Sequence, residues 1–313
     1  MKVIFLLLCF LNTLNAEVFN TDIAPFVDSK QFGSIRLLDQ KRLDFKTIAG
    51  TKFSEISDLA YEQKSKKLYF VGDEGKLFVF DTSFGKKIDK LEPLDSVRLT
   101  KGNGEAFAPW QCDSEGLALN KKGELCISFE GRAKIGRFGV NGRMLGSYAL
   151  PLRLRNPQNY RSRNKSLEAL AWHPRYGLLT AAEWPLKQSE NKVQTVYALE
   201  GKTWHFKAEA EPKSAVVAIE VMEDGNLLVL ERSFTALFEP LVVTLKKVYL
   251  NDCTAKQSLC RSEVLLKMDS HKGWMIDNFE GLTRVSRHRY AMVSDDNDNF
   301  FQQTLLVYFE ISD

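Results

Sequence analysis

Acidic residues recur in pairs at regular intervals along this chain. The first acid of each pair lies in a short segment such as "DSEGLAL", "SLEALAW" or "DNFEGLTR". In chain order the first acids are Asp58, Glu115, Glu168, Glu220 and Glu280, and the second acids are Asp73, Glu130, Glu183, Glu231 and Asp295. The second acid follows the first by 15 residues in four copies and by 11 residues between Glu220 and Glu231. Carboxylates repeated in this way could together bind a cation or a polar substrate.

Carboxylate and amide oxygens are ligands for Ca²⁺ or Mg²⁺ rather than for Zn²⁺. The densest group of such oxygens is "SDDNDN", and there we expect Asp295, Asp296 and Asn297 to bind a metal, with Ca²⁺ as the ion. This segment lacks the Gly and the distal Glu of an EF-hand loop. A bound cation could polarise a phosphoryl oxygen and activate water.

Other catalytic motifs are missing. The sequence has no G-x-S-x-G, no P-loop and no H-E-x-x-H, and it has only 4 histidines. We therefore expect no organic cofactor. The net charge of +3, without a Lys/Arg-rich block, argues against a nucleic-acid partner.

The segments that carry the acids have the pattern of β-strands. Short apolar runs follow polar turns in "KKLYFVGD", "GELCISFE", "GLLTAAEW", "NLLVLERS" and "RYAMVSDD". Successive first acids are 57, 53, 52 and 60 residues apart. Periods of this length fit propeller blades. We expect an all-β fold, a single β-propeller whose blades are three- or four-stranded antiparallel sheets.

The number of blades is five or six. Five units are visible, and a sixth could lie between residues 235 and 277, where the spacing is longest. Residues 32–46 have a strand-like pattern, and we expect them to pair with the last blade, so that strands from both chain ends close the ring. A β-sandwich with accidental spacing is the alternative fold.

Equivalent positions in a propeller lie at the same end of the central axis, so the repeated acids would form a ring. Crowded carboxylates raise one another's pKa and need a cation, a basic partner or backbone donors. Small residues after the first acid, Gly116, Ala169 and Gly281, would let the backbones pack closely at the axis. In the alternative interpretation, the acids only bond neighbouring blades together.

The N-terminus, "MKVIFLLLCFLNTLNA", has the pattern of a secretory signal peptide over residues 1–16. We expect residues 17–313 to form one propeller domain in the periplasm or outside the cell, as a monomer without a membrane span. Four cysteines then remain, which favours two disulfides. The expected pairs are Cys253 with Cys260 and Cys112 with Cys126, and four free thiols are the alternative.

The ordered set "DSEGLAL", "RNKSLEALAW", "AAEWPL", "LLVLERSF" and "DNFEGLTR…MVSDDN" resembles the bacterial phytase-like family of exported proteins, also called "esterase-like activity of phytase". The resemblance covers about Ile56 to Ile311 and implies a propeller-like fold and an ester or phosphate-ester hydrolase activity. This chain departs from the family pattern at Ala169, where Gly is expected, and at "ISDLAY", which has Asp in place of Glu. The histidine-acid phosphatase pattern is absent.

By position, the resemblance assigns roles to twelve residues. The expected catalytic residues are Glu115, Glu168, Glu231 and Arg232; the expected substrate-binding residues are Asn164, Glu130, Glu183, Asn278 and Glu280; the expected metal ligands are Asp295, Asp296 and Asn297. In this hypothesis Arg232 binds the oxyanion of a small-molecule ester or phosphate ester. The alternatives are a non-catalytic periplasmic propeller that binds a ligand or cation, and a module of an envelope assembly.

Overall fold

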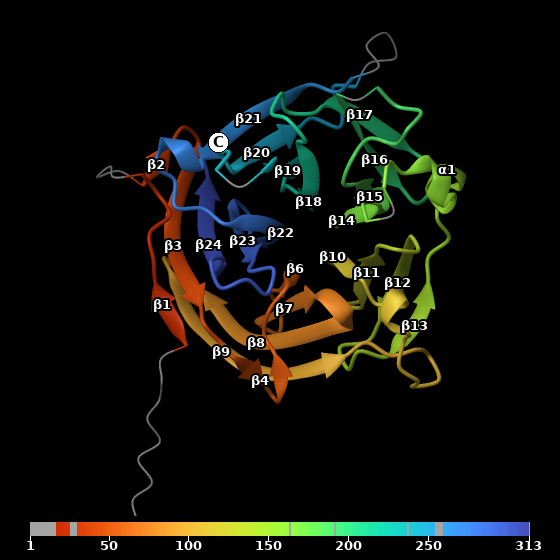
Figure 1. The fold of residues 1–313 in the computed structure, drawn as a ribbon, viewed down its shortest axis with the longest axis horizontal. Helices are drawn as coiled ribbons and strands as arrows, with labels where there is room; N and C mark the ends of the chain where they lie inside the picture. Colours follow the sequence, from red (N-terminus) through yellow and green to blue (C-terminus); the bar gives the residue numbers. More distant parts are fainter. Residues whose placement is uncertain are drawn as a thin grey trace, which may run out of the picture.

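The computed structural model describes residues 17–25, 30–162, 164–190, 192–236, 238–253 and 259–312. Five antiparallel sheets stand around one central axis as the blades of a β-propeller (Figure 1). The all-β propeller predicted from the repeat is confirmed, and the β-sandwich is excluded. The predicted signal peptide, residues 1–16, lies outside the described residues.

Four blades are meanders of four strands, with the first strand of each nearest the axis. Blade 1 contains β6 (Ile56–Glu62), β7 (Lys67–Gly72), β8 (Lys76–Phe84) and β9 (Ile88–Arg98). Blade 2 contains β10 (Ser114–Leu119), β11 (Leu125–Phe129), β12 (Lys134–Phe138) and β13 (Met144–Ser147). Blade 3 contains β14 (Leu167–His173), β15 (Gly177–Ala182), β16 (Val193–Ala198) and β17 (Thr203–Lys207). Blade 4 contains β18 (Ala215–Val221), β19 (Leu227–Ser233), β20 (Val242–Val248) and β21 (Ser262–Asp269).

Blade 5 joins the two ends of the chain. Its strands, from the axis outward, are β22 (Asn278–Ser286), β23 (Arg289–Asp295), β24 (Thr304–Ile311), β3 (Ile35–Leu43) and β1 (Val18–Asn20), and β2 (Gln31–Phe32) also pairs with β3. The N-terminal β3 pairs antiparallel with the C-terminal β24, as in the register Leu306↔Lys41. The predicted closure of the ring by strands from both ends is confirmed.

Of the two expected blade counts, five is correct, since the described residues between 235 and 277 form no sixth blade. This segment supplies β20 and β21, the two outer strands of blade 4. The segment is long because the connections before and after β20 are long. The long spacing between the first acids of blades 4 and 5 therefore reflects long loops and no additional blade. The remaining elements are β4 (Thr47–Ile48), β5 (Thr51–Lys52), α1 (Leu152–Arg155), η1 (Asp73–Gly75), η2 (Pro109–Gln111), η3 (Pro157–Asn159) and η4 (Ser270–Lys272). No helix in the described part of the chain is long and apolar enough to span a membrane.

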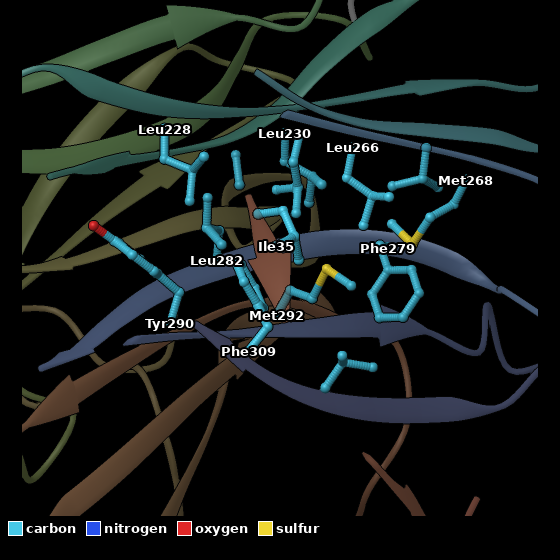
Figure 2. Close-up of a cluster of buried hydrophobic side chains, with 14 of the residues drawn as sticks. Ile35, Leu228, Leu230, Leu266, Met268, Phe279, Leu282, Tyr290, Met292 and Phe309 are labelled. Atoms are coloured by element: carbon cyan, nitrogen blue, oxygen red, sulfur yellow. The ribbon is translucent and has the colours of Figure 1, made fainter. Parts of the chain in front are cut away.

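The hydrophobic core is divided among the interfaces between blades. Five clusters of buried side chains fill the five interfaces. Between blades 4 and 5, for example, Leu230 and Met268 pack in the same cluster as Phe279 and Met292 (Figure 2). Strands β7, β11 and β15 are apolar on both faces because each face contacts a neighbouring blade. This packing fixes the end of each innermost strand relative to the next.

Glycines allow the innermost strands to approach one another closely. A Cβ on Gly116 would lie 2.4 Å from the Glu168 backbone oxygen, and a Cβ on Gly281 would lie 2.8 Å from the Asp58 Cα. The prediction that small residues after the first acid permit close packing is confirmed. Ala169, at the same position in blade 3, is fully buried.

One of the two predicted disulfides exists. Cys253 and Cys260 are bonded, whereas the predicted Cys112–Cys126 bond is wrong because both are buried free thiols. Cys126 lies in the cluster between blades 2 and 3, with its Sγ 3.5 Å from the Tyr148 hydroxyl. Cys112 packs instead against Gly75 of blade 1. The two thiols therefore have different neighbours, one between blades 2 and 3 and the other at blade 1.

Candidate functional site at one end of the propeller axis

Every blade has an irregularity in register at the same place in its first strand pair. The shifts fall between Ile56 and Asp58, Ser114 and Leu117, Leu167 and Ala169, Val216 and Ala218, and Phe279 and Gly281. Such β-bulges leave a residue unpaired and re-aim its side chain. The bulged residues are Ser57, Glu115, Glu168, Val217 and Glu280, so three of the five are glutamates. The bulge is the backbone feature that places these predicted site residues.

In each blade, the residue just before the bulge pairs with a residue near the end of the second strand. The next residue along that second strand is the second position of the repeat. The residues at this position are Asp73, Glu130, Glu183, Arg232 and Asp295. Arg232 therefore occupies the place that the other blades give to an acid, because Glu231 is one residue earlier and pairs with Val216. We call these second-position residues, together with Glu115, Glu168 and Glu280, the acid ring.

The alignment of Glu220 with Glu231 needs correction. The structurally equivalent pair in blade 4 is Val217 and Arg232, which keeps the spacing of 15 residues. Glu220 lies farther along β18, opposite Leu228, and its carboxylate accepts a hydrogen bond from the Arg284 backbone N–H at 2.8 Å. It lines a small pocket at the other end of the innermost strands. Its similarity to the repeated acids is a coincidence of spacing.

Asp58 bonds blades together. It follows the bulge in blade 1 and is 2 % exposed. Its carboxylate accepts backbone N–H bonds from Leu59 at 2.8 Å, from Leu117 at 2.7 Å and from Leu282 at 3.0 Å. For Asp58 the alternative interpretation holds, in which the acid only bonds neighbouring blades together, since its oxygens accept hydrogen bonds from blades 1, 2 and 5.

Cationic side chains neutralise one half of the acid ring. Arg232 Nη1 lies 2.9 Å from Glu280 Oε1, and its Nη2 lies 3.3 Å from Glu183 Oε1. Lys165 Nζ lies 2.7 Å from Glu183 Oε2. Asn278 accepts from Arg232 and donates to Glu280 Oε1 at 2.9 Å. We call these five residues the paired half. Because Arg232 already contacts two carboxylates, its guanidinium is held in place rather than free to follow a substrate.

The other half of the site has no such neutralisation. Oxygens of Glu115, Glu130 and Glu168 all lie within 4.8 Å of one another, and so do oxygens of Asp73, Asp113 and Glu115. We call these five carboxylates the anionic half. Glu130 accepts from the Ser166 backbone N–H at 2.8 Å, and Asp73 accepts from the Ser57 hydroxyl at 3.3 Å.

Two members of the anionic half lack partners. Within the described ranges, the carboxylates of Glu115 and Glu168 accept no hydrogen bond, and none of the five carboxylates has an ion pair within 4.0 Å. Glu168 is nevertheless only 8 % exposed. Burying an ionised carboxylate without a partner is costly, so these groups require a cation or a proton.

The pKa values of these carboxyl groups reflect the same cost of burying a charge. Burial, and after it the neighbouring Asp113, raises the pKa of Asp73 to about 7. Burial raises the pKa of Glu130 to about 8, with Glu183 adding to the shift. Burial and then nearby carboxylates raise the pKa values of Glu115 and Glu168 well above their usual range. The unliganded site therefore retains protons near neutral pH.

Several predicted site residues lie apart from this group. Glu231 is 1 % exposed and contacts Lys246 Nζ at 2.8 Å, the Ser214 hydroxyl at 2.9 Å and the Glu209 backbone N–H at 2.7 Å. These contacts place Glu231 beneath the segment 209–214 rather than in the acid ring. Asn164 stands in an exposed turn before β14.

The predicted metal ligands Asp295 and Asp296 in "SDDN" accept hydrogen bonds from backbone N–H groups. Asp295 accepts from the Asn297 N–H at 2.8 Å, and Asp296 accepts from the Glu55 N–H at 2.8 Å. Among the described residues, the groups close enough to share an ion lie elsewhere, in the anionic half. A metal at Asp295, Asp296 and Asn297 stays a prediction.

Sequence reasoning missed Asp113 and the partner role of Lys165. Asp113 is outside the repeat, and the only signal was its place two residues before Glu115 in "CDSEG". Its backbone oxygen accepts from the Glu130 N–H at 2.8 Å, which holds the loop before β10 against the end of β11.

The anionic half fits a calcium ion. Ca²⁺–oxygen distances of about 2.3–2.6 Å allow two ligands of one ion to stand up to about 5 Å apart. The 4.8 Å separation within each carboxylate group is inside that range. The donors are hard oxygens, the ligand type that Ca²⁺ prefers.

Fold and site together define a five-bladed β-propeller with a carboxylate-rich site at one end of its axis. The chain belongs to the Phytase-like family, described as "Esterase-like activity of phytase", which matches residues 51–298. No curated protein matches the chain.

Solved structures of other proteins show distant similarity. A streptogramin B lyase shares 8% identity, with 89% of this chain and 97% of that chain covered and a TM-score of 0.39. A virginiamycin B lyase from Staphylococcus aureus shares 11% identity, with coverages of 94% and 98% and a TM-score of 0.41. The PQQ-bound aldose sugar dehydrogenase from Streptomyces coelicolor shares 12% identity, with coverages of 92% and 100% and a TM-score of 0.42. At these scores, none carries a functional argument for this chain.

Proposed function

We propose that this protein is an exported phytase-like propeller that binds Ca²⁺ at the acid ring and hydrolyses a small ester or phosphate ester there. The observation that carries the proposal is that carboxylate oxygens of Glu115, Glu130 and Glu168 lie within 4.8 Å of one another, while Glu115 and Glu168 lack partners among the described residues. Export is supported by the N-terminal sequence pattern and by the Cys253–Cys260 disulfide, since such bonds persist in oxidising compartments.

The anionic half would hold the cation. When bound, Ca²⁺ would supply Lewis-acid polarisation of a carbonyl or phosphoryl oxygen. Lys165 is the basic group best placed to meet a substrate, since its side chain is 32% exposed beside Glu183. Arg232 is a positioning residue, because it holds Glu183 and Glu280 at fixed places in the ring.

Proton transfer would use a carboxylate of the acid ring. Hydrolysis forms a bond from water oxygen to carbon or phosphorus, breaks the ester bond and delivers a proton to the leaving oxygen. Burial raises the pKa of Asp73 to about 7 and that of Glu130 to about 8 in the ion-free site, and a bound cation would lower both values. A carboxylate of the ring that the ion leaves free could accept the proton that water loses.

A neighbouring pocket offers room for the rest of the substrate. It has a volume of about 300 Å³ and is lined by Arg232, Phe234, Leu241, Asn278, Asn297 and Gln302. Phe234 is half exposed. The pocket combines an apolar wall with amide groups, so it suits a small organic group attached to the ester.

The test is hydrolysis by residues 17–313. The substrates are a chromogenic phosphate monoester and a short acyl ester, each with Ca²⁺ or with chelator. We expect Ca²⁺-dependent turnover that falls about 10- to 100-fold in Glu168→Gln and in Glu115→Gln. The matched control, Glu200→Gln, changes an exposed glutamate in the turn between β16 and β17. Equal rates in the wild type and both site variants would contradict the hydrolase.

A non-catalytic cation- or ligand-binding propeller is the second candidate. It is favoured by the composition of the site, since the acid ring consists of carboxylates and one Arg. Ca²⁺ binding that depends on Glu168, with no turnover of either ester, would establish this function.

A further inference from the structure

We propose that the end of the propeller with the acid ring docks onto an anionic phospholipid surface. Aromatic side chains in its loops would enter the lipid interface, and a groove beside blade 3 would bind a head-group phosphate. The inference concerns an interaction surface of the protein and does not depend on hydrolysis at the acid ring.

Exposed apolar side chains are concentrated in the loops at this end. The loops precede β10, β14 and β22 or follow β19 and β23, the strands that lead to residues of the acid ring. Because these strands belong to four blades, the loops lie around the axis (Figure 1). The exposed large apolar side chains in these loops are Trp110, Leu152, Phe234, Phe238, Met275, Phe300 and Phe301.

The opposite end of the axis differs. Its turns, such as "EQKSKK", "NKKGE" and "MEDGN", are polar, and Val140 is the one exposed large apolar side chain that the structure describes in them. The other exposed large apolar side chains lie in the outermost strands of their blades and are Phe19, Leu94, Leu145 and Val264. Single exposed apolar residues are ordinary on a protein surface. Their concentration in the loops of one end indicates an interaction surface.

Three phenylalanines in these loops are almost fully in water. Phe300 is 95% exposed, and Phe238 and Phe301 are each 87% exposed. The rings of Phe300 and Phe301 contact each other, with centroids 5.6 Å apart. A phenylalanine left in water gains none of the free energy that burial would supply. Phe and Trp enter the boundary between head groups and acyl chains in proteins that bind at a membrane surface.

A groove formed by loops of blade 3 and the connection to blade 4 carries positive charge. It has a volume of about 390 Å³, and the cations that line it are Arg161, Lys192 and Lys213. None of the three has a carboxylate within 4.0 Å in the part of the chain that the structure describes. The glutamates of the groove, Glu209 and Glu211, lie 2.7 Å and 2.8 Å from Lys267 Nζ. The groove therefore retains cations for an external anion.

The groove adjoins the aromatic loop of blade 4. Lys213 Nζ donates a hydrogen bond to the Thr235 backbone oxygen at 3.2 Å, and Thr235 directly follows Phe234. Cations therefore lie beside exposed aromatic rings. A phospholipid presents a phosphate beside hydrocarbon, and basic side chains are attracted to anionic bilayers. A free phosphate would use the groove alone, whereas a phospholipid uses both features.

Vesicle co-sedimentation of residues 17–313 tests the docking. The vesicles are phosphatidylglycerol mixed with phosphatidylcholine, or phosphatidylcholine alone. We expect binding to the anionic vesicles that weakens at high salt, and weaker binding to phosphatidylcholine. No binding to either composition would overturn the proposal and leave a protein as the partner of this end.

The aromatic loops are tested by a double variant, Phe300→Ser with Phe301→Ser. It should bind the anionic vesicles about 10-fold or more weakly, because two rings no longer enter the interface. The matched control is Val140→Ser at the opposite end, which should bind as the wild type. Circular dichroism would confirm that the variants are folded. An unchanged affinity of the double variant would contradict docking through these loops.

The groove is tested in the same way. Lys192→Gln with Lys213→Gln should weaken binding to the anionic vesicles about 10- to 30-fold, because each lysine is attracted to the anionic surface. Lys121→Gln with Lys122→Gln removes the same charge from an exposed turn at the opposite end and should have little effect. Equal losses in the two double variants would show that the net charge, and not the groove, determines binding.

Insertion has its own readout in the fluorescence of Trp110. This residue lies in η2, before β10, and is exposed. Lipids with brominated acyl chains should quench the wild type, and Trp110→Phe should still bind but lose much of the quenching. Binding without quenching in the wild type would overturn the insertion of the loops. None of these assays measures hydrolysis, so their failure would leave the proposed function untouched.

Discussion

The carboxylate of Asp58 accepts a hydrogen bond from the backbone N–H of Leu282 at 3.0 Å, across 224 residues of sequence. A second bond, from the Leu117 N–H at 2.7 Å, extends the same carboxylate to blade 2. The central strands of blades 1, 2 and 5 thus meet at one buried side chain.

We expect Asp58→Asn to destabilise the fold by about 2 to 3 kcal/mol, because the new amide group presents a donor to backbone N–H groups and leaves one unsatisfied. Urea unfolding measures the change. Asp95→Asn, on the exposed side of β9, is the control and should be nearly neutral. Equal free energies of unfolding for the two variants would show that the hydrogen bonds of Asp58 contribute little to stability.

Arg232 should matter for stability as well as for the site. Arg232→Gln leaves Glu280 without its ion-pair partner and Glu183 with Lys165 alone, and removing one partner of a buried ion pair costs about 3 to 5 kcal/mol. Thermal unfolding at neutral pH would show the loss. The double variant Arg232→Gln, Glu280→Gln removes one orphaned charge and should recover part of it. A double variant less stable than the single one would argue against this interpretation.

Lys134 should give the unfolding free energy a pH dependence in the alkaline range. Its ammonium lies 4.4 Å from the Phe107 ring centre and 4.2 Å from that of Phe129. Burial lowers the pKa of Lys134 from 10.5 to about 8. Between these values the unfolded chain binds more protons than the folded one, so this group makes stability rise with pH from about 8 to about 10.5.

The measurement is urea unfolding at pH 8 and pH 10. The stability difference between these pH values should be more positive in the wild type than in Lys134→Met, which keeps the packing and removes the titration. Lys121→Met, in the exposed turn before β11, is the control and should behave as the wild type. An unchanged pH dependence in Lys134→Met would contradict the assignment.

The number of reactive thiols tests the assignment of the cysteines. Unreduced, denatured residues 17–313 should show two reactive thiols, Cys112 and Cys126, and reduction should raise the count to four. Cys253→Ser should lower stability by about 2 to 3 kcal/mol, because the disulfide restricts a short loop in the unfolded chain. Cys126→Ser serves as a comparison, since it changes a core thiol and no bond. A count of zero in the unreduced protein would contradict the two free thiols.

The sequence repeat predicted much of the fold, since short strands at a long period have few other arrangements. Glu115, Glu168 and Glu280 were also found from sequence, because each bulge keeps the 15-residue spacing to the second position. Blade 4 was misaligned because spacing between acids cannot reveal a bulge at Val217. The prediction of the Cys112–Cys126 bond failed because sequence distance does not say against which blade a thiol packs. Asp113 lies outside the repeat, so only coordinates could bring it to the site.

The pairing of β3 with β24 also constrains how the protein is made. During synthesis, the first four blades can form while the edge of β3 that pairs with β24 is still open, because β24 (Thr304–Ile311) follows all four in the sequence. The ring can therefore be closed only after β24 has been translated. Until then the growing chain carries an unpaired strand edge at β3, and in the folded propeller β24 covers that edge.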